Sequence, residues 1–181
     1  KIYDEAKVDY SNVIISKEYS TGAAAIMVNE KTGTNAINVF PGAASGITNN
    51  DIDKAEEAIK NSKIFLTQLE VSKDTVIYAI KKAKALGAQT ILNPAPAADI
   101  DESIFPFIDY FTPNETEASF YVNHPVVTHD DATKAATTLL EMGIKNVIIT
   151  LGEKGAYFAN ANETFSSPIA NLLNPVVDTT G

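Results

Sequence analysis

A strand, a helix and a second strand are predicted within residues 64–96, IFLTQLEVSKDTVIYAIKKAKALGAQTILNPAP. Residues 64–69 form a short apolar run that is typical of a buried strand. Ser72 then marks the start of a helix, which carries apolar residues at helical spacing and ends at Gly87, and residues 90–92 follow as the next strand. Because such a connection joins parallel strands in a right-handed crossover, this segment predicts a parallel α/β sheet.

The same alternation continues on both sides of this segment. Before it, Thr48 is followed by Asn-Asn-Asp and marks a helix start. After it, strands are predicted at residues 108–111 and 147–150, and helices at residues 114–121 and 128–143. This order, with its short connections, predicts an α/β fold: a doubly wound, mainly parallel sheet flanked by helices.

The first part of the chain has a different pattern. Residues 13–16, 23–28 and 36–40 are short β-type segments, and turn-forming residues between the last two predict an antiparallel hairpin. These segments do not fit the alternation of strands and helices. We therefore expect two parts, a mostly β lid with its connection at residues 1–47 and an α/β body at residues 48–181.

Composition restricts the class of protein. Of the 181 residues, 45% are hydrophobic and 20% are charged, as in an ordinary globular domain. The net charge of −9 is spread along the chain, so we expect neither nucleic acid nor a membrane surface as a partner. The chain has no cysteine and no apolar run near the ~18 residues of a membrane span, which predicts a cytoplasmic location.

Both ends resemble interruptions within a longer protein. The chain begins with Lys1 rather than Met, and it ends with Val-Asp-Thr-Thr-Gly at Gly181. We therefore expect the body to be truncated at its C-terminus.

Ligands of an open parallel sheet bind beyond the carboxyl ends of the strands, so the residues that follow each strand are the candidates for a site. Glu70 follows the first strand of the body, where its carboxylate could accept hydrogen bonds from two sugar hydroxyls. Alternatively, Glu70 is the N-terminal acid of the next helix, which the helix dipole favours. The next strand is followed by residues 93–96, Asn-Pro-Ala-Pro, which predict a rigid loop.

Asn114 and Glu117 lie three residues apart at the start of a predicted helix. They would face the same side near the positive end of the helix dipole, a suitable place for phosphate oxygens and, through water, for a magnesium ion. An ordinary N-cap at Asn114, with Glu117 closing a capping box, explains the same pair and is favoured by the local sequence alone.

A tight glycine loop follows the strand at residues 147–150, and it consists of Thr150, Leu151, Gly152, Glu153, Lys154 and Gly155. Its glycines let backbone N–H groups approach a phosphate, although the Gly-Lys-Ser/Thr of a Walker loop is missing. His124 and His129 have no further ligand at metal spacing and are assigned to solvent. Near the end, Asp178 and Thr180 could supply a side-chain and a carbonyl oxygen to a monovalent cation.

Short motifs are distributed over essentially the whole chain: Ser-Thr-Gly at 20–22, Pro-Gly-Ala at 41–43, Gln-Leu-Glu at 68–70, Asn-Pro-Ala-Pro-Ala at 93–97, Thr-Pro-Asn-Glu-Thr-Glu-Ala at 112–118, Ile-Thr-Leu-Gly at 149–152 with Gly155, and Val-Asp-Thr-Thr-Gly at 177–181. Each motif is weak by itself. In this order and at these separations they resemble the ribokinase group of the phosphofructokinase-B (PfkB) sugar kinase family.

The resemblance implies an α/β body that binds ATP and a sugar, and a small β-sheet lid that closes over the sugar and forms the contact of a homodimer. It implies that Glu70 binds the sugar, that Asn114 and Glu117 organise the ATP phosphates and magnesium, and that residues 150–155 shape the nucleotide site. Asp178 and Thr180 are then similar to ligands of an activating potassium ion.

The implied reaction is transfer of the γ-phosphoryl group of MgATP to a primary hydroxyl of D-ribose, giving ribose 5-phosphate. The alternatives are fructose, a sugar phosphate or a nucleoside as the substrate, and a non-catalytic module that binds a sugar or a nucleotide. The family's glycine-rich sugar loop would lie before Lys1, and the aspartate that acts as the base would lie beyond Gly181. We therefore expect the 181-residue fragment alone to be inactive.

Overall fold

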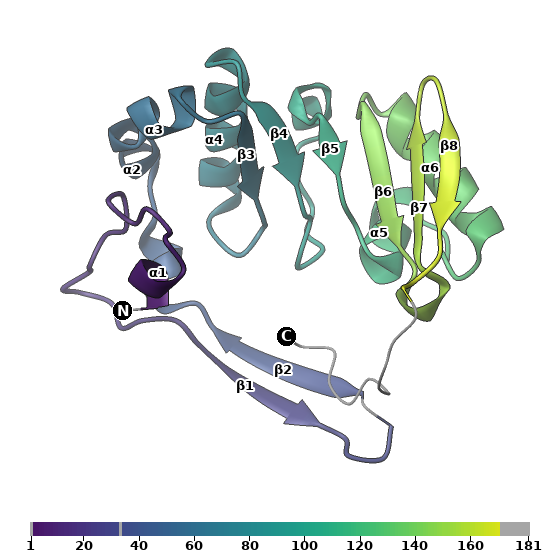
Figure 1. Cartoon of the computed structure of the whole chain (residues 1–181), viewed down its shortest axis with the longest axis horizontal. Helices are drawn as coiled ribbons and strands as arrows, with labels where there is room; N and C mark the ends of the chain where they lie inside the picture. The colour runs from purple at the N-terminus through teal and green to yellow at the C-terminus, as the bar shows by residue number, and fades with distance from the viewer. Residues whose placement is uncertain (1, 33, 171–181) are drawn as a thin grey trace.

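The computed structural model describes residues 2–32 and 34–170 (Figure 1). Its elements are, in chain order, α1 (Ile2–Glu5), β1 (Ala23–Val28), β2 (Asn35–Phe40), η1 (Gly42–Gly46), α2 (Asn49–Lys54), α3 (Glu56–Lys60), β3 (Ile64–Thr67), α4 (Lys73–Ala85), β4 (Gln89–Leu92), η2 (Glu102–Phe107), β5 (Tyr110–Phe111), α5 (Glu115–Val122), α6 (His129–Glu141), β6 (Asn146–Thr150), η3 (Gly152–Lys154), β7 (Ala156–Asn160) and β8 (Thr164–Ser167). Asp178 and Thr180 lie outside the described residues. Among the helices that the structure describes, none has the length and apolar character needed to cross a membrane.

The strands form two sheets (Figure 1). β1 and β2 make a two-stranded antiparallel sheet, called the β1–β2 ribbon below. The main sheet has the order β3-β4-β5-β6-β7-β8, in which β3 to β6 are parallel and β7 and β8 are antiparallel. The predicted fold class, a mainly parallel α/β sheet with a separate small sheet, is confirmed.

Several details differ from the prediction, and β5 covers only Tyr110–Phe111 of the strand predicted at residues 108–111. Residues 13–16, predicted as a strand, have no regular structure and are mostly exposed, because no described strand pairs with their backbone. The helix that begins after Thr48 divides at Ala55 into α2 and α3. The first strand of the main sheet ends at Thr67 rather than at residue 69. Segments of β-type composition therefore form strands only where a described partner strand is present.

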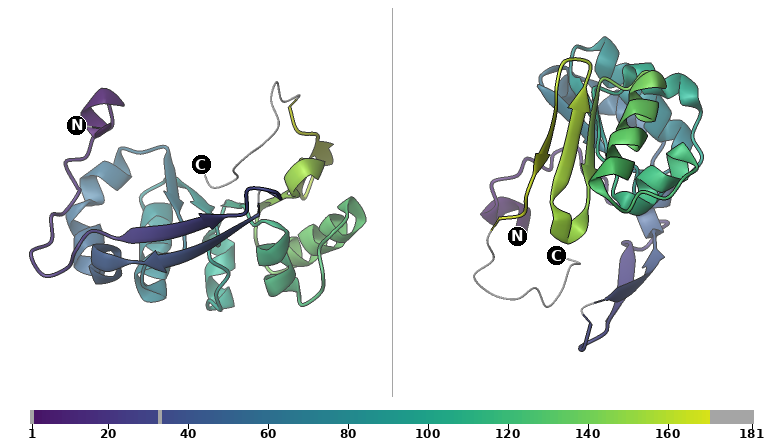
Figure 2. Two further views of the ribbon diagram at one scale, coloured as in Figure 1. Left: turned by 90° about the horizontal axis from the view of Figure 1, so that it is seen from below. Right: turned by 90° about the vertical axis from the view of Figure 1, so that its right-hand side faces the viewer.

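The helices α4, α5 and α6 lie on the same face of the main sheet (Figure 2). Strand residues that point to this face are in register and buried: Leu92 pairs with Phe111, Phe111 pairs with Val147, and none of the three is more than 1% exposed. Residues of the opposite face, such as Ile64 and Leu66, are 53% and 63% exposed. The alternation of side chains along each strand produces this division.

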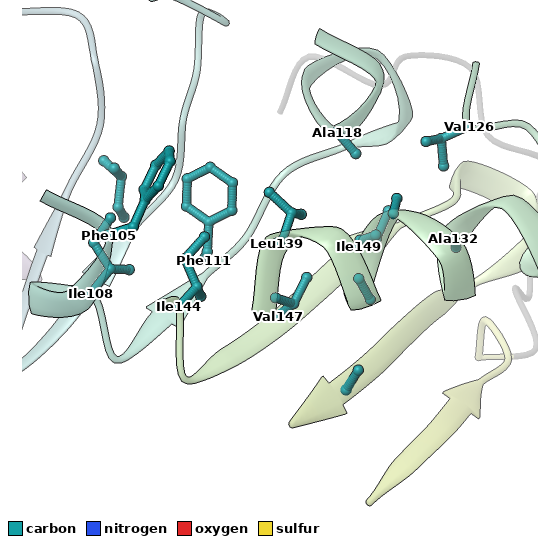
Figure 3. Close-up of a cluster of buried hydrophobic side chains, with 14 of the residues drawn as sticks. Phe105, Ile108, Phe111, Ala118, Val126, Ala132, Leu139, Ile144, Val147 and Ile149 are labelled. Atoms are coloured by element: carbon teal, nitrogen blue, oxygen red, sulfur yellow. The ribbon is translucent and has the colours of Figure 1, made fainter. Parts of the chain in front are cut away.

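The core lies between this face and the helices (Figure 3). The rings of Phe105 and Phe111 meet edge to face, with their centroids 6.1 Å apart. The buried side of α6 carries several alanines and Leu139, which allow the helix to approach the strands closely. Each large apolar side chain buried here contributes roughly 1.5–3 kcal/mol. This packing holds the central strands, and with them their carboxyl ends, in fixed positions.

One buried carboxylate ties the amino ends of the central strands together. Asp109 is 6% exposed and accepts hydrogen bonds from Lys84 Nζ at 2.5 and 2.6 Å, from Lys145 Nζ at 2.9 Å and from the backbone N–H of Thr90 at 3.0 Å. Burial raises the pKa of Asp109, but the hydrogen bonds from Lys84 and Lys145 outweigh it and lower the pKa to about 2. The carboxylate is therefore charged at neutral pH and joins α4, β4 and the start of β6.

Candidate functional site

The carboxyl ends of β3, β4, β5 and β6 form one edge of the main sheet (Figure 1). Because these strands are parallel neighbours, the segments that follow them lie side by side. In strand order, the segments contain Glu70, residues 93–98, Asn114 and Gly152. The strands β3 and β6, which Glu70 and Gly152 follow, are separated by three strand spacings of about 4.8 Å, or about 14 Å. The predicted site regions thus share one edge, with residues 93–98 between them.

Glu70 lies in the turn between β3 and α4, and its side chain is exposed. The acidic residue in the first turn of α4 is Asp74, so Glu70 does not serve as the helix's N-terminal acid. The neighbouring backbone is fixed, since the N–H of Leu69 donates to the carbonyl oxygen of Ala95 at 2.9 Å. The Glu70 carboxylate is therefore available to a ligand at this edge.

Asn114 and Glu117 form a capping box at the start of α5. Asn114 Oδ1 accepts a hydrogen bond from the Glu117 N–H, and Glu117 Oε2 accepts one from the Asn114 N–H, both at 2.8 Å. The N–H of Thr150 donates to the Pro113 carbonyl at 3.0 Å, which joins this helix start to the end of β6. The sequence offered a capping box as an alternative explanation of Asn114 and Glu117, and the structure contains this capping box. Its hydrogen bonds fix the carboxylate of Glu117, and the residue is 8% exposed.

The loop at residues 150–155 is closed by its own backbone. The N–H of Leu151 donates to the Gly155 carbonyl at 2.8 Å, and the N–H groups of Lys154 and Gly155 donate to the carbonyls of Leu151 and Gly152. The side chain of Leu151 belongs to the core, whereas Thr150 and Glu153 are exposed. Lys154 Nζ donates to the Val127 carbonyl at 2.7 Å and ties the loop to the segment before α6.

Gly155 is required by two features of this loop. Its φ of +88° is rarely adopted by other residues, and an added Cβ would collide with the Ser167 carbonyl oxygen and lie 2.9 Å from Pro168 Cα.

Gly155→Ala is expected to lower the free energy of unfolding by about 3 kcal/mol or more, measured by urea unfolding. Gly87→Ala is the control, because Gly87 has a φ of +93° but no atom within 4 Å of its Cβ, so only the strain of about 1–2 kcal/mol applies. Equal losses in the two variants would contradict the role of the collision.

The sequence did not predict the β7–β8 hairpin that supplies this neighbour of Gly155. β6, β7 and β8 pair consecutively, and the end of β8 at Ser167 pairs with Ala156. The available signal was the polar turn between β7 and β8, in which Asn160 Oδ1 accepts hydrogen bonds from the N–H groups of Asn162 and Glu163.

Metal ligands are sparse in the part of the chain that the structure describes. Within residues 2–32 and 34–170, no group of three or more His, Cys, Asp or Glu side chains could hold an ion. His124 and His129, assigned to solvent, are both partly exposed. The first turn of α5 carries two carboxylates, Glu115 and Glu117, and the oxygen chemistry of Glu117 fits a magnesium ion that keeps water ligands and is bound together with phosphates.

Residues 2–181 match the pfkB family carbohydrate kinases. The chain belongs to the PfkB family. The family resemblance inferred from the motifs is confirmed, and the edge described above carries four of those motifs, at residues 68–70, 93–97, 112–118 and 149–155.

Relatives of this PfkB chain include two curated sugar kinases. It is 40% identical over 159 residues to the ribokinase of Staphylococcus aureus (strain COL), covering 88% of this chain and 52% of the relative. It is 39% identical over 163 residues to the deoxyribokinase of Salmonella typhi, covering 90% and 52%. The PfkB chain thus spans about half the length of these relatives.

A solved structure has the same fold. The structure of Arabidopsis thaliana ribokinase complexed with ribose and ATP superposes on this PfkB chain with a TM-score of 0.76 and 29% identity. The match covers 91% of this chain and 53% of the ribokinase chain.

Proposed function

We propose that the full-length protein transfers the γ-phosphoryl group of MgATP to a primary hydroxyl of a small sugar, and that the sugar is D-ribose. The observation that carries the proposal is the order of groups along one sheet edge, from Glu70 through residues 93–98 and Asn114 to Gly152. The sugar lies at the β3 side and the nucleotide at the β5 and β6 side. The ribokinase relatives at up to 40% identity support the substrate class.

Each group in the site has a role that follows from its position. The exposed carboxylate of Glu70 accepts hydrogen bonds from two sugar hydroxyls. Asn114 and Glu117 orient the phosphates at the N-terminus of α5, and residues 150–155 surround the nucleotide. Magnesium, when bound with ATP, neutralises the charge of the phosphates. Asp178 and Thr180, outside the described residues, hold an activating potassium ion.

The β1–β2 ribbon acts as the lid of the proposed site. It lies beyond the carboxyl ends of β3 to β6 (Figures 1 and 2), and it supports a division into a lid at residues 1–47 and a body at residues 48–181. The register places Ile26 opposite Ile37 and Ala24 opposite Val39, so the face of the ribbon that carries these four residues is mostly apolar. Ile26, Ile37 and Val39 are 48–53% exposed, and a two-stranded sheet alone is marginally stable. We propose that this face packs against a second copy of the chain.

The test of the proposed function is a coupled assay of ADP formation by the full-length protein with D-ribose, 2-deoxyribose, fructose and adenosine. We expect kcat/KM for D-ribose to exceed that for each other substrate by at least about 10-fold. Preference for 2-deoxyribose is the second candidate, because a deoxyribokinase is 39% identical. Binding of ribose and an ATP analogue in calorimetry without turnover would instead indicate a non-catalytic module.

A further inference from the structure

The loop at residues 93–98 occupies the middle of the proposed site. It follows β4, which lies between β3 and β5, so the loop separates the Glu70 turn from the helix start at Asn114. An in-line transfer needs the sugar hydroxyl and the phosphate at a fixed separation, and a misplacement near 1 Å lowers the rate by roughly 100-fold. The attachments of this loop therefore bear on the geometry of the reaction.

The loop is attached on both sides. On the β3 side, the Leu69 N–H donates to the Ala95 carbonyl at 2.9 Å, which makes the loop and the Glu70 turn one unit. On the other side, the hydroxyl of Tyr121 donates to the Ala98 carbonyl at 2.8 Å. Tyr121 lies on α5, four residues after Glu117, and therefore one helical turn from the capping box.

The ring of Tyr121 is itself held in place. It meets Phe111 edge to face with the centroids 5.3 Å apart, and Phe105 at 6.2 Å. Phe111 is fully buried at the end of β5. Burial raises the pKa of Tyr121 to about 12, so its hydroxyl carries the proton that it donates throughout the neutral range. The phenol is thus a fixed donor rather than a flexible surface group.

We propose that Tyr121 is a positioning residue of the kinase site, whose hydroxyl sets the distance between the sugar side and the nucleotide side by holding the 93–98 loop against α5. The proposal rests on the proposed function. The capping box holds Asn114 and Glu117 without Tyr121, and the Glu70 turn is held by Leu69 and Ala95. Loss of the hydroxyl therefore alters the placement of the two ligands relative to each other rather than the binding of either one.

The test is Tyr121→Phe in the full-length protein, which keeps the ring and removes the donor. We expect kcat for D-ribose to fall about 10-fold, with KM for ribose and for MgATP within about 2-fold of wild type. The rate is expressed per site that binds an ATP analogue in calorimetry, since misfolded protein lowers the number of sites and not the rate per site. Hydrogen–deuterium exchange of the Leu69 amide, which donates to the Ala95 carbonyl of the loop, is expected to become faster.

Tyr78→Phe is the matched control. It also removes a tyrosine hydroxyl that donates a hydrogen bond, but to Asp53 on α2, away from the proposed site. The proposal is overturned if kcat per site in Tyr121→Phe stays within about 2-fold of the Tyr78→Phe value, or if exchange of the Leu69 amide is unchanged. Absence of sugar phosphorylation by the wild-type protein would overturn the proposed function as well, and it would be visible before any variant is compared.

Discussion

Glu117→Gln is expected to lower kcat of the full-length protein about 100-fold while changing its free energy of unfolding by less than about 0.5 kcal/mol. The structure gives Glu117 a capping role, and glutamine at the third helical position also completes a capping box. The amide does not replace the negative charge that magnesium or its water ligands would require. A large loss of turnover without a loss of stability would separate the proposed role in the site from the role in the helix.

The control for this variant is Asp131→Asn. Asp131 closes the capping box of α6 with Thr128, so the substitution makes the same change from carboxylate to amide at the third position of another helix. Steady-state kinetics with varied magnesium and urea unfolding would be measured for both variants. If Glu117→Gln and Asp131→Asn had the same kcat, Glu117 would be a helix cap and nothing more.

Asp109→Asn is expected to lower the free energy of unfolding by about 3 kcal/mol at pH 7. Asparagine keeps the shape of the side chain, but it removes the buried negative charge to which the partly exposed ammonium groups of Lys84 and Lys145 donate. The comparison variant is Asp53→Asn, in which an exposed carboxylate loses its contacts with Lys82 and Tyr78. Urea unfolding should show a much smaller loss for Asp53→Asn, because water and salt screen that pair.

The effect of Asp109 is also expected to depend on pH. Its pKa is about 2 in the folded protein against 3.8 ordinarily, so its charged form stabilises the fold above pH 4 and this contribution is lost as the pH falls toward 2. The contribution is about 2 kcal/mol, and about half of it should be lost by pH 3. The difference in unfolding free energy between wild type and Asp109→Asn should therefore narrow between pH 5 and pH 3. A constant difference over that range would show that the carboxylate does not act through its charge.

The elements that were predicted correctly are those specified by neighbouring residues. The helix that starts after Ser72 carries its buried residues at helical spacing, and Gly87 follows its C-terminal end with a positive φ. The helix starts at Thr48 and Thr128 and the capping box at Asn114 were predicted because a helix cap involves residues at most three positions apart. The sheet edge could be anticipated because parallel strands end on the same side.

The elements that were missed or placed wrongly depend on distant partners. Residues 13–16 have strand-like composition, but no described strand pairs with them. The sequence also did not show that the side chain of Leu151 packs in the core, while the backbone of its loop stays part of the predicted nucleotide site. The β7–β8 hairpin was not predicted, although it supplies the atoms that leave room only for glycine at Gly155.

The sequence by itself determined the alternation of strands and helices, the helix ends and the polar residues that follow each strand, because these depend on spacings of a few residues. The tertiary structure alone decided that Asp109 meets Lys84 and Lys145, and that the Tyr121 hydroxyl reaches the Ala98 carbonyl. These partners are 23–36 residues apart. Contacts over such separations are fixed by strand order and by the packing of helices on the sheet, which local periodicity does not encode.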